Sequence, residues 1–169
     1  DLVRINDAII SDNLCNNSNL QALFQHVKNK TSTLHLMGLI SDGGVHSHLD
    51  HYEYILSAGR KNRVEKIAVH AFMDGRDTSP NSGIEYVKQL ESWIKSDDGY
   101  KVATICGRYF AMDRDTRWER IESAYKMLVH SMGDKYTDSE SAICASYEKE
   151  ITDEFIQPAI IGDPTPIQN

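Results

Sequence analysis

Histidine, arginine and carboxylate side chains follow three apolar segments of the sequence, at the point where each segment ends. Arginine offers a planar fork of N–H donors that binds a carboxylate or a phosphate through paired hydrogen bonds. Several arginines that meet at one place would therefore bind a small dianion, although any single one could equally make an ordinary surface ion pair with an acidic residue nearby. The candidates for anion binding are Arg76, Arg108 and Arg114.

Asp77 follows directly after Arg76 and is the best candidate for proton transfer. A carboxylate held beside a guanidinium group stays ionised near neutral pH, because the neighbouring positive charge favours its charged form. Such a carboxylate can accept a proton from a substrate hydroxyl group. We therefore predict Asp77 as a general base.

The first polar segment, residues 41–48, contains the pair Gly43-Gly44 and two histidines. Paired glycines allow a tight turn and let bare backbone amides approach a ligand, but such a pair is also common in plain turns. His46 and His48 could bind substrate or cap the following helix. Together with Asp42 and nearby His51 they could also hold a metal ion, since imidazole and carboxylate are ordinary zinc or manganese ligands.

The elements that must position these side chains alternate between two kinds. Three short runs rich in apolar residues are typical of buried strands, and they lie at residues 34–40, 67–73 and 102–106. Segments with apolar residues three and four apart predict helices, the first opening with the capping-box pair Ser18 and Gln21. The predicted helices cover residues 18–30, 49–59, 80–94, 115–129 and 139–149.

Strands joined by crossover helices form a mostly parallel sheet with helices on both faces. We therefore predict an α/β fold, a three-layer sandwich in which the whole chain, residues 1–169, is one domain. Because ligands bind outside the carboxyl ends of such strands, the polar clusters should converge at one edge. Residues 3–10 and 151–161 would be edge strands or stumps of a longer chain, and the ends, residues 1–17 and 157–169, are predicted to be linker-like.

The composition narrows the range of partners. Lys and Arg number 18 against 25 Asp and Glu, a formal net charge of −7. An acidic chain repels nucleic-acid phosphates, and its apolar runs are far shorter than the roughly 18–20 residues that cross a bilayer. We therefore expect no nucleic-acid or membrane partner. We also expect a monomer. The three cysteines match no zinc or disulfide spacing, which is typical of a reducing compartment and predicts the cytoplasm.

Four motifs together resemble cofactor-independent (2,3-bisphosphoglycerate-independent) phosphoglycerate mutase. They are GLISDGGVHSH, AFMDGRDTSP, GRYFAMDRDTRW and TDEFIQP, and the resemblance extends over essentially the whole chain. It covers only the inserted phosphotransferase domain of that family. The resemblance implies that the substrate is bound by His46, Arg76, Asp77, Arg108 and Arg114.

The resemblance also implies a glycolytic and gluconeogenic isomerase that interconverts 3-phosphoglycerate and 2-phosphoglycerate. In that family an alkaline-phosphatase-like domain carries two Mn²⁺ ions and the serine that becomes phosphorylated, and no segment of this chain resembles it. We therefore expect a domain excised from a two-domain enzyme, with no metal or other cofactor of its own and inactive alone.

Two other hypotheses remain open at this point. The chain could be a stand-alone module that binds a phosphorylated metabolite through its arginines. It could also be a metal-dependent hydrolase that uses Asp42, His46 and His48. The first predicts tight binding without a partner domain, and the second predicts one bound metal ion per chain.

Overall fold

The computed structural model describes residues 2–168. Its first half contains α1 (Leu2–Ile10), the 3₁₀ helix η1 (Leu14–Asn16), α2 (Ser18–Lys30), β1 (Leu34–Leu39), α3 (Leu49–Lys61), β2 (Ile67–Met73) and α4 (Gly83–Ile94). Its second half contains β3 (Tyr100–Gly107), α5 (Arg108–Ala111), α6 (Trp118–His130), β4 (Asp134–Tyr136), α7 (Ser139–Tyr147), the 3₁₀ helix η2 (Asp153–Phe155) and β5 (Ala159–Ile161).

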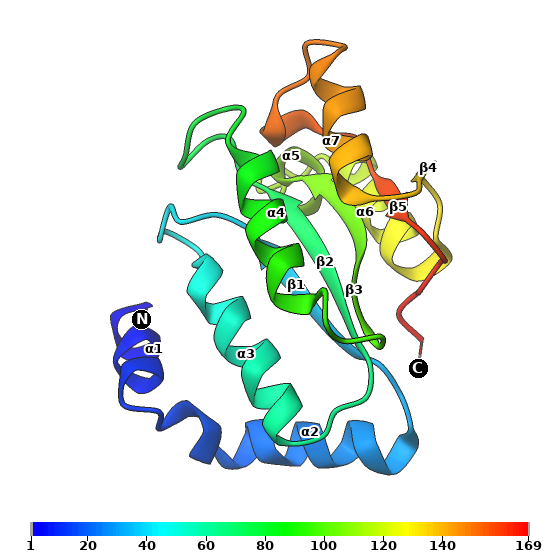
Figure 1. The fold of residues 1–169 in the computed structure, drawn as a ribbon. Coiled ribbons are helices and arrows are strands. Elements are labelled where there is room, and N and C mark those ends of the chain that lie inside the picture. Colours follow the sequence, from blue (N-terminus) through cyan, green and yellow to red (C-terminus); the bar gives the residue numbers. More distant parts are fainter. Residues whose placement is uncertain (1, 169) are drawn as a thin grey trace.

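The five strands form one mostly parallel sheet in the order β1-β2-β3-β5-β4. β1, β2 and β3 run parallel to one another, which makes β1-α3-β2 and β2-α4-β3 the two crossover units predicted from the sequence. β5 is antiparallel to β3, and β4 runs parallel to β5. The carboxyl ends of the parallel strands β1, β2 and β3 therefore lie at one edge of the sheet, the upper edge in Figure 1.

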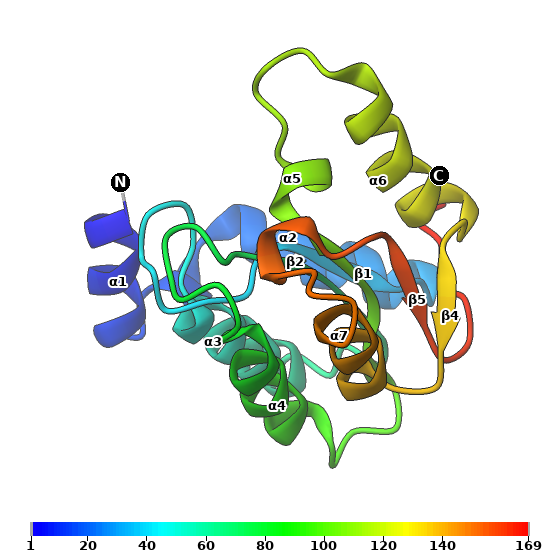
Figure 2. The ribbon, with the colours of Figure 1, turned by 90° about the horizontal axis from the view of Figure 1, so that it is seen from above.

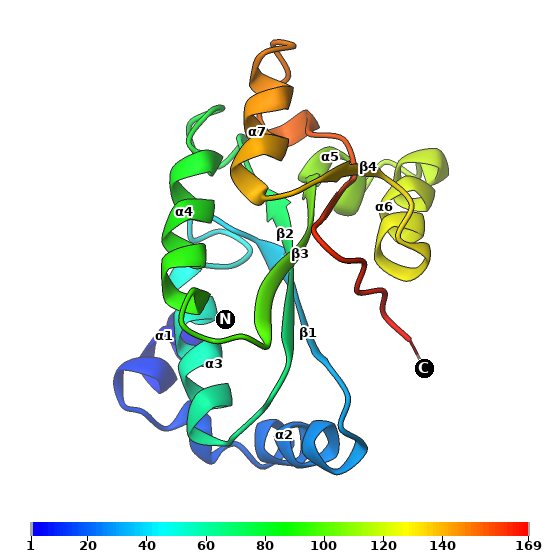
Figure 3. The ribbon, with the colours of Figure 1, turned by 45° about the vertical axis from the view of Figure 1, so that its right-hand side comes forward.

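Helices cover both faces of the sheet, which confirms the predicted α/β sandwich. α3, α4 and α7 lie along one face and α6 lies on the other (Figure 3). The larger core belongs to the first face, where Leu56 of α3 and Leu90 of α4 are fully buried with Ile67 and Ile105 from the strands. A smaller core lies beneath α6, where Met127 packs with Cys106 and Ile160.

The chain ends correct two predictions. Residues 3–10, for which an edge strand was one of two predictions, lie in the helix α1 beside α3; their apolar residues suit a strand by type, but they fall on one face of a helix. Residues 159–161 lie in the sheet between β3 and β4 and are buried, so this part of the end predicted to be linker-like belongs to the core. A three-residue strand is too short to show a strand period in the sequence.

The predicted start of α2 is confirmed, but its cap differs. Asn17 is the N-cap, and its side-chain oxygen accepts hydrogen bonds from the backbone N–H groups of Asn19 and Leu20. Ser18 is thus the first helical residue. Gln21, predicted as the capping-box partner, donates instead to the carbonyl of Cys15 at 2.6 Å and ties the helix to η1.

The segment around η2 closes over the edge where β2 and β3 end, beside α5 in Figure 2. Two glycines make this close approach possible. A Cβ atom at Gly107 would lie 2.2 Å from the carbonyl oxygen of Glu154, and one at Gly75 would lie 2.8 Å from the Glu154 nitrogen. Gly75 also has φ +65, a conformation that residues with a Cβ rarely adopt. The fold therefore delivers Glu154, far along the chain, to the ends of both strands.

Among the helices that the structure describes, none is long and apolar enough to cross a lipid bilayer.

Candidate functional site

A cavity of about 670 Å³ opens at the carboxyl ends of β1, β2 and β3. It is lined by all five residues predicted to bind substrate, namely His46, Arg76, Asp77, Arg108 and Arg114. They come from the loop after β1, the loop after β2, the start of α5 and the loop before α6. The expected convergence of polar residues at one edge of the sheet is thus present in the structure.

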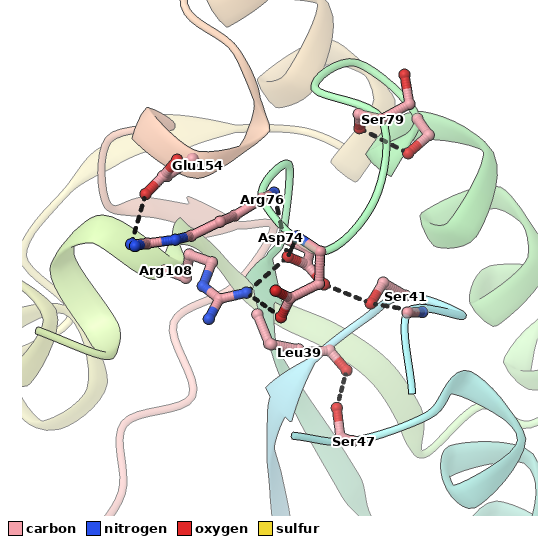
Figure 4. A network of polar contacts seen from close by, with 11 residues as sticks. Leu39, Ser41, Ser47, Asp74, Arg76, Ser79, Arg108 and Glu154 are labelled. Carbon is pink, nitrogen blue, oxygen red and sulfur yellow. Dashed lines mark hydrogen bonds and ion pairs between the residues drawn. The ribbon is translucent and has the colours of Figure 1, made fainter. Parts of the chain in front are cut away.

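Asp74 organises the floor of this site. It follows β2 directly, and its side chain is 2% exposed. Its Oδ2 atom accepts a hydrogen bond from Ser41 Oγ at 2.7 Å, across from the end of β1. Its Oδ1 atom accepts the backbone N–H groups of Arg76 and Asp77 at 3.2 and 3.0 Å (Figure 4). Asp74 therefore fixes the turn that carries Arg76 and Asp77.

Burial alone would raise the pKa of the Asp74 carboxyl group. Hydrogen bonds from the Asp77 N–H, from Ser41, from Arg108 and from the Arg76 N–H outweigh that effect and hold this pKa below its ordinary value. Asp74 therefore carries a negative charge beneath the cavity near neutral pH.

Arg108 bridges two carboxylates with a single nitrogen. Its Nη1 atom donates to Asp74 Oδ1 at 2.7 Å and to Asp77 Oδ2 at 2.6 Å. The Arg108 side chain is 10% exposed and that of Asp77 is 21% exposed. Asp77 thus lines the cavity while its carboxylate accepts a hydrogen bond from Arg108. The buried Asp74 carboxylate accepts a hydrogen bond from the same Arg108 nitrogen.

Arg76 and Glu154 form a second ion pair at the cavity wall. Arg76 Nη1 lies 3.6 Å from Glu154 Oε1, and the Arg76 side chain is half exposed. Figure 4 shows Arg76 extending from the loop after β2 toward Glu154 on η2. Glu154 is one of four acidic side chains in a cavity that four arginines also line. It belongs to the TDEFIQP motif but was not predicted as a site residue.

The loop before α6 carries Arg114, which is exposed and for which the structure of residues 2–168 shows no ion pair. Next to it, Asp113 pairs with Arg120 at 3.1 Å. The Arg120 guanidinium group lies over the ring of Tyr109, with 3.8 Å from its central carbon to the ring centroid. Sequence reasoning did not select Tyr109 or Arg120 as site residues, although both line the cavity.

The loop after β1 brings His46 to the cavity and is tied down on both sides. Ser47 Oγ donates to the Leu39 carbonyl at 2.7 Å, and the hydroxyl group of Tyr86 on α4 donates to Asp42. His48 caps α3, since its Nδ1 atom accepts the Asp50 N–H at 3.2 Å. Of the two histidines in this loop, His46 lines the cavity and His48 serves the helix.

The residues proposed as metal ligands have other roles in the structure. Across residues 2–168, no group of three or more histidine, cysteine or acidic side chains is arranged to hold a metal ion. The three proposed ligands Asp42, His46 and His48 instead bond Tyr86, line the cavity and cap α3, respectively.

An α/β domain with four arginines around one cavity at the carboxyl ends of its strands has the chemistry to hold a small organic anion. Comparison with known proteins then identifies the family. The family described as the BPG-independent PGAM N-terminus matches residues 5–169. The chain therefore belongs to this family, which confirms the resemblance found in the motifs.

Individual relatives agree with this assignment. The chain is 47% identical to the 2,3-bisphosphoglycerate-independent phosphoglycerate mutase of Myxococcus xanthus, over 99% of this chain and 33% of that protein. It is 45% identical to the enzyme of the same name from Syntrophotalea carbinolica, over 98% of this chain and 32% of that protein. The chain spans about a third of the length of these relatives.

A solved structure shows the same fold. The phosphoglycerate mutase of Leishmania mexicana superimposes with a TM-score of 0.92 at 29% identity. The superposition covers 99% of this chain and 33% of that one.

Proposed function

We propose that this domain holds the glycerate part of 3-phosphoglycerate and 2-phosphoglycerate in a phosphoglycerate mutase with two domains. The observation that carries the proposal is that His46, Arg76, Asp77, Arg108 and Arg114 line one cavity. Relatives three times as long that bear the mutase name support it. A cytoplasmic location and a monomeric state remain predictions.

The arginines have separate tasks in this proposal. Arg114 has no carboxylate partner in the described chain and is free to meet the ligand's carboxylate with its fork of donors. Arg108 is anchored by Asp74, so it would bind without having to be ordered first. A site with prearranged donors loses less entropy when the ligand binds.

Asp77 would accept the proton of a glycerate hydroxyl group in one half-reaction and return it in the other. Its Oδ2 atom is bonded to Arg108, and its side chain is partly exposed to the cavity. When a hydroxyl group attacks a phosphoryl group its proton must leave, and an ionised carboxylate within hydrogen-bond reach accepts it. In the reverse half-reaction the same carboxyl group returns the proton to the alkoxide.

Phosphoryl transfer itself would take place against the alkaline-phosphatase-like domain of the parent enzyme. Its serine would receive the phosphoryl group from 3-phosphoglycerate and return it to the other hydroxyl group. The two Mn²⁺ ions implied for that domain would stabilise the charge on the phosphoryl group. The present domain would keep the glycerate in place while it turns between the two half-reactions. The 169-residue chain alone is therefore expected to give no mutase turnover.

The experiment that tests the proposal compares three ligands by NMR titration of the labelled chain. Binding of 3-phosphoglycerate is expected on the order of millimolar, about −4 kcal/mol, because only half of the site is present. Glycerate should bind within about threefold of this affinity, since this domain is proposed to hold the glycerate part. Inorganic phosphate should bind more weakly than either.

The rival hypothesis of a stand-alone anion module predicts the opposite order. In that case the arginines would recognise the phosphoryl group, so phosphate would compete well and glycerate would not bind. That result would overturn the proposal. Interconversion of 3- and 2-phosphoglycerate by the purified chain would also contradict it.

A further inference from the structure

Arg120 and Asp113 form a partly buried ion pair at the wall of the cavity. Arg120 Nη1 lies 3.1 Å from Asp113 Oδ1, and the two side chains are 22% and 2% exposed. The guanidinium group of Arg120 also stacks on the ring of Tyr109 at 3.8 Å. A guanidinium group held by a carboxylate on one side and by a ring on its face has little freedom to turn toward a ligand.

The other oxygen of Asp113 holds the loop that carries Arg114. Asp113 Oδ2 accepts the backbone N–H groups of Asp115 at 3.2 Å and of Arg117 at 2.9 Å. Arg114 lies between these bonded positions along the chain. Thr116, in the same loop, has φ +58, which is unfavourable for a β-branched residue and persists only where surrounding bonds impose it. The loop is therefore defined by the Asp113 carboxylate.

Arg120 connects this loop to the helix that carries Arg108. It belongs to the first turn of α6, and its stacking partner Tyr109 is the residue directly after Arg108 on α5. The Tyr109 ring is itself held against Phe155, with the two centroids 5.1 Å apart. The chain of contacts thus runs from a fixed aromatic pair through Arg120 and Asp113 to the loop of Arg114.

We propose that Arg120 is a positioning residue, which sets the place of Arg114 through Asp113 and does not itself bind the ligand. This inference rests on the proposed function, in which Arg114 meets the glycerate carboxylate. Arg120 lines the cavity as well, so its positive charge would attract an anion even if it positioned nothing. An experiment must separate these two roles.

A double-mutant cycle separates them. Arg120→Lys keeps the charge but loses the planar fork and the stacked face. It is expected to weaken 3-phosphoglycerate binding about tenfold, the loss of one well-placed charge-assisted hydrogen bond, and Arg114→Ala should cost about the same. If Arg120 acts through Arg114, the double variant binds no more than about twofold more weakly than Arg114→Ala alone.

Arg117→Lys is the matched control. Arg117 lies in the same loop and contributes its backbone N–H to Asp113, and its side chain is exposed and not among those that line the cavity in residues 2–168. This variant should bind like the wild type. Independent losses that add in the double variant, or wild-type affinity in Arg120→Lys, would overturn the positioning role.

Hydrogen exchange measured without ligand tests the positioning role of Arg120 independently of the proposed function. The amide protons of Asp115 and Arg117 are bonded to Asp113, so their hydrogen exchange should speed up in Arg120→Lys and stay unchanged in Arg117→Lys. Failure of every variant and of the wild type to bind 3-phosphoglycerate would count against the proposed function. Unchanged exchange in Arg120→Lys would count against the positioning role alone.

Discussion

Arg108 donates from Nη1 to Oδ1 of Asp74 at 2.7 Å, and both side chains are nearly closed to solvent. Asp74 is not among the residues of the described chain that line the cavity, whereas Arg108 is. A buried carboxylate thus holds the guanidinium group that is proposed to bind the ligand. The site is prearranged by a residue that would itself touch no ligand.

Asp74→Asn should therefore weaken the site as well as the fold. The amide keeps the shape of the carboxylate but not its charge, and Arg108 is then paired with Asp77 alone. We expect a loss of about 2 kcal/mol in the free energy of unfolding and clearly weaker 3-phosphoglycerate binding. Urea unfolding and NMR titration measure the two effects.

Ser41→Ala is the matched control for this variant. It removes the 2.7 Å bond to Asp74 Oδ2 and leaves the carboxylate charge in place. It should cost about 1 kcal/mol of stability and leave ligand binding nearly unchanged. Binding by Asp74→Asn as tight as by the wild type would show that the charge of Asp74 does not position Arg108.

The lowered pKa of Asp74 predicts a specific dependence on acid. The folded state binds this proton less tightly than the unfolded state, whose carboxyl group has the ordinary pKa of 3.8. The stability that Asp74 contributes is therefore present above pH 3.8 and is lost as the pH falls through the lower value of the folded state. Urea midpoints of the wild type and Asp74→Asn should converge as the pH is lowered.

Glu154→Gln should tighten ligand binding. The Glu154 carboxylate lies 3.6 Å from Arg76 and competes with an anionic ligand for it. Because Arg76 is half exposed, the gain is modest, up to roughly fivefold in affinity for 3-phosphoglycerate. Weaker binding in the titration would mean that Glu154 orients Arg76 for the ligand.

We predict that the protein loses stability in mild acid because His70 is buried in its neutral form. Its Nδ1 atom lies 2.9 Å from Thr104 Oγ1 and its Nε2 atom 2.8 Å from Nδ1 of His35, whose ring stacks on it. Burial, and secondarily the charge of His35, lower the pKa of His70 from 6.5 to about 4. The folded state thus keeps His70 neutral at a pH where the unfolded chain binds a proton.

The stability contributed by neutral His70 is complete above pH 6.5 and is lost as the pH falls toward about 4. The loss amounts to roughly 3 kcal/mol. Urea midpoints of the wild type should fall over this range, and His70→Gln should fall less steeply. His26→Gln, at an exposed position of α2, should keep the wild-type slope. An equal slope in His70→Gln would contradict the assignment.

Gly107→Ala tests the closure of the η2 segment over the sheet edge. Its Cβ atom would lie 2.2 Å from the carbonyl oxygen of Glu154, so the backbone of one segment must move. We expect a loss of roughly 3 kcal/mol or more in unfolding free energy. Gly162→Ala, with φ +59 but no atom within 4 Å, should cost only about 1 kcal/mol. Equal costs would show that the close approach is not required.

The three parallel strands and the meeting of polar residues at their carboxyl ends could be predicted from the sequence because their signals are local. The strand runs are apolar and separated by helical spacing, and parallel strands bring their carboxyl ends together whatever the details of packing.

The parts that sequence reasoning missed depend on distant contacts. β5 is three residues long, and its place between β3 and β4 follows from packing and not from any periodic pattern. Glu154 reaches the cavity only because Gly75 and Gly107 leave room for its backbone. The sequence does not distinguish Arg120 from an ordinary arginine on a helix surface. Its contacts with the ring of Tyr109 and the carboxylate of Asp113 are seen only in the folded chain.

The most direct test of the central claim is a chemical-shift map of the labelled chain titrated with 3-phosphoglycerate, with Arg114→Ala as control. We expect saturable shifts confined to the cavity, at His46, Arg76, Asp77, Arg108 and Arg114, which weaken in the variant. Shifts scattered over the surface, or none at about 10 mM ligand, where a millimolar site is nearly full, would contradict it.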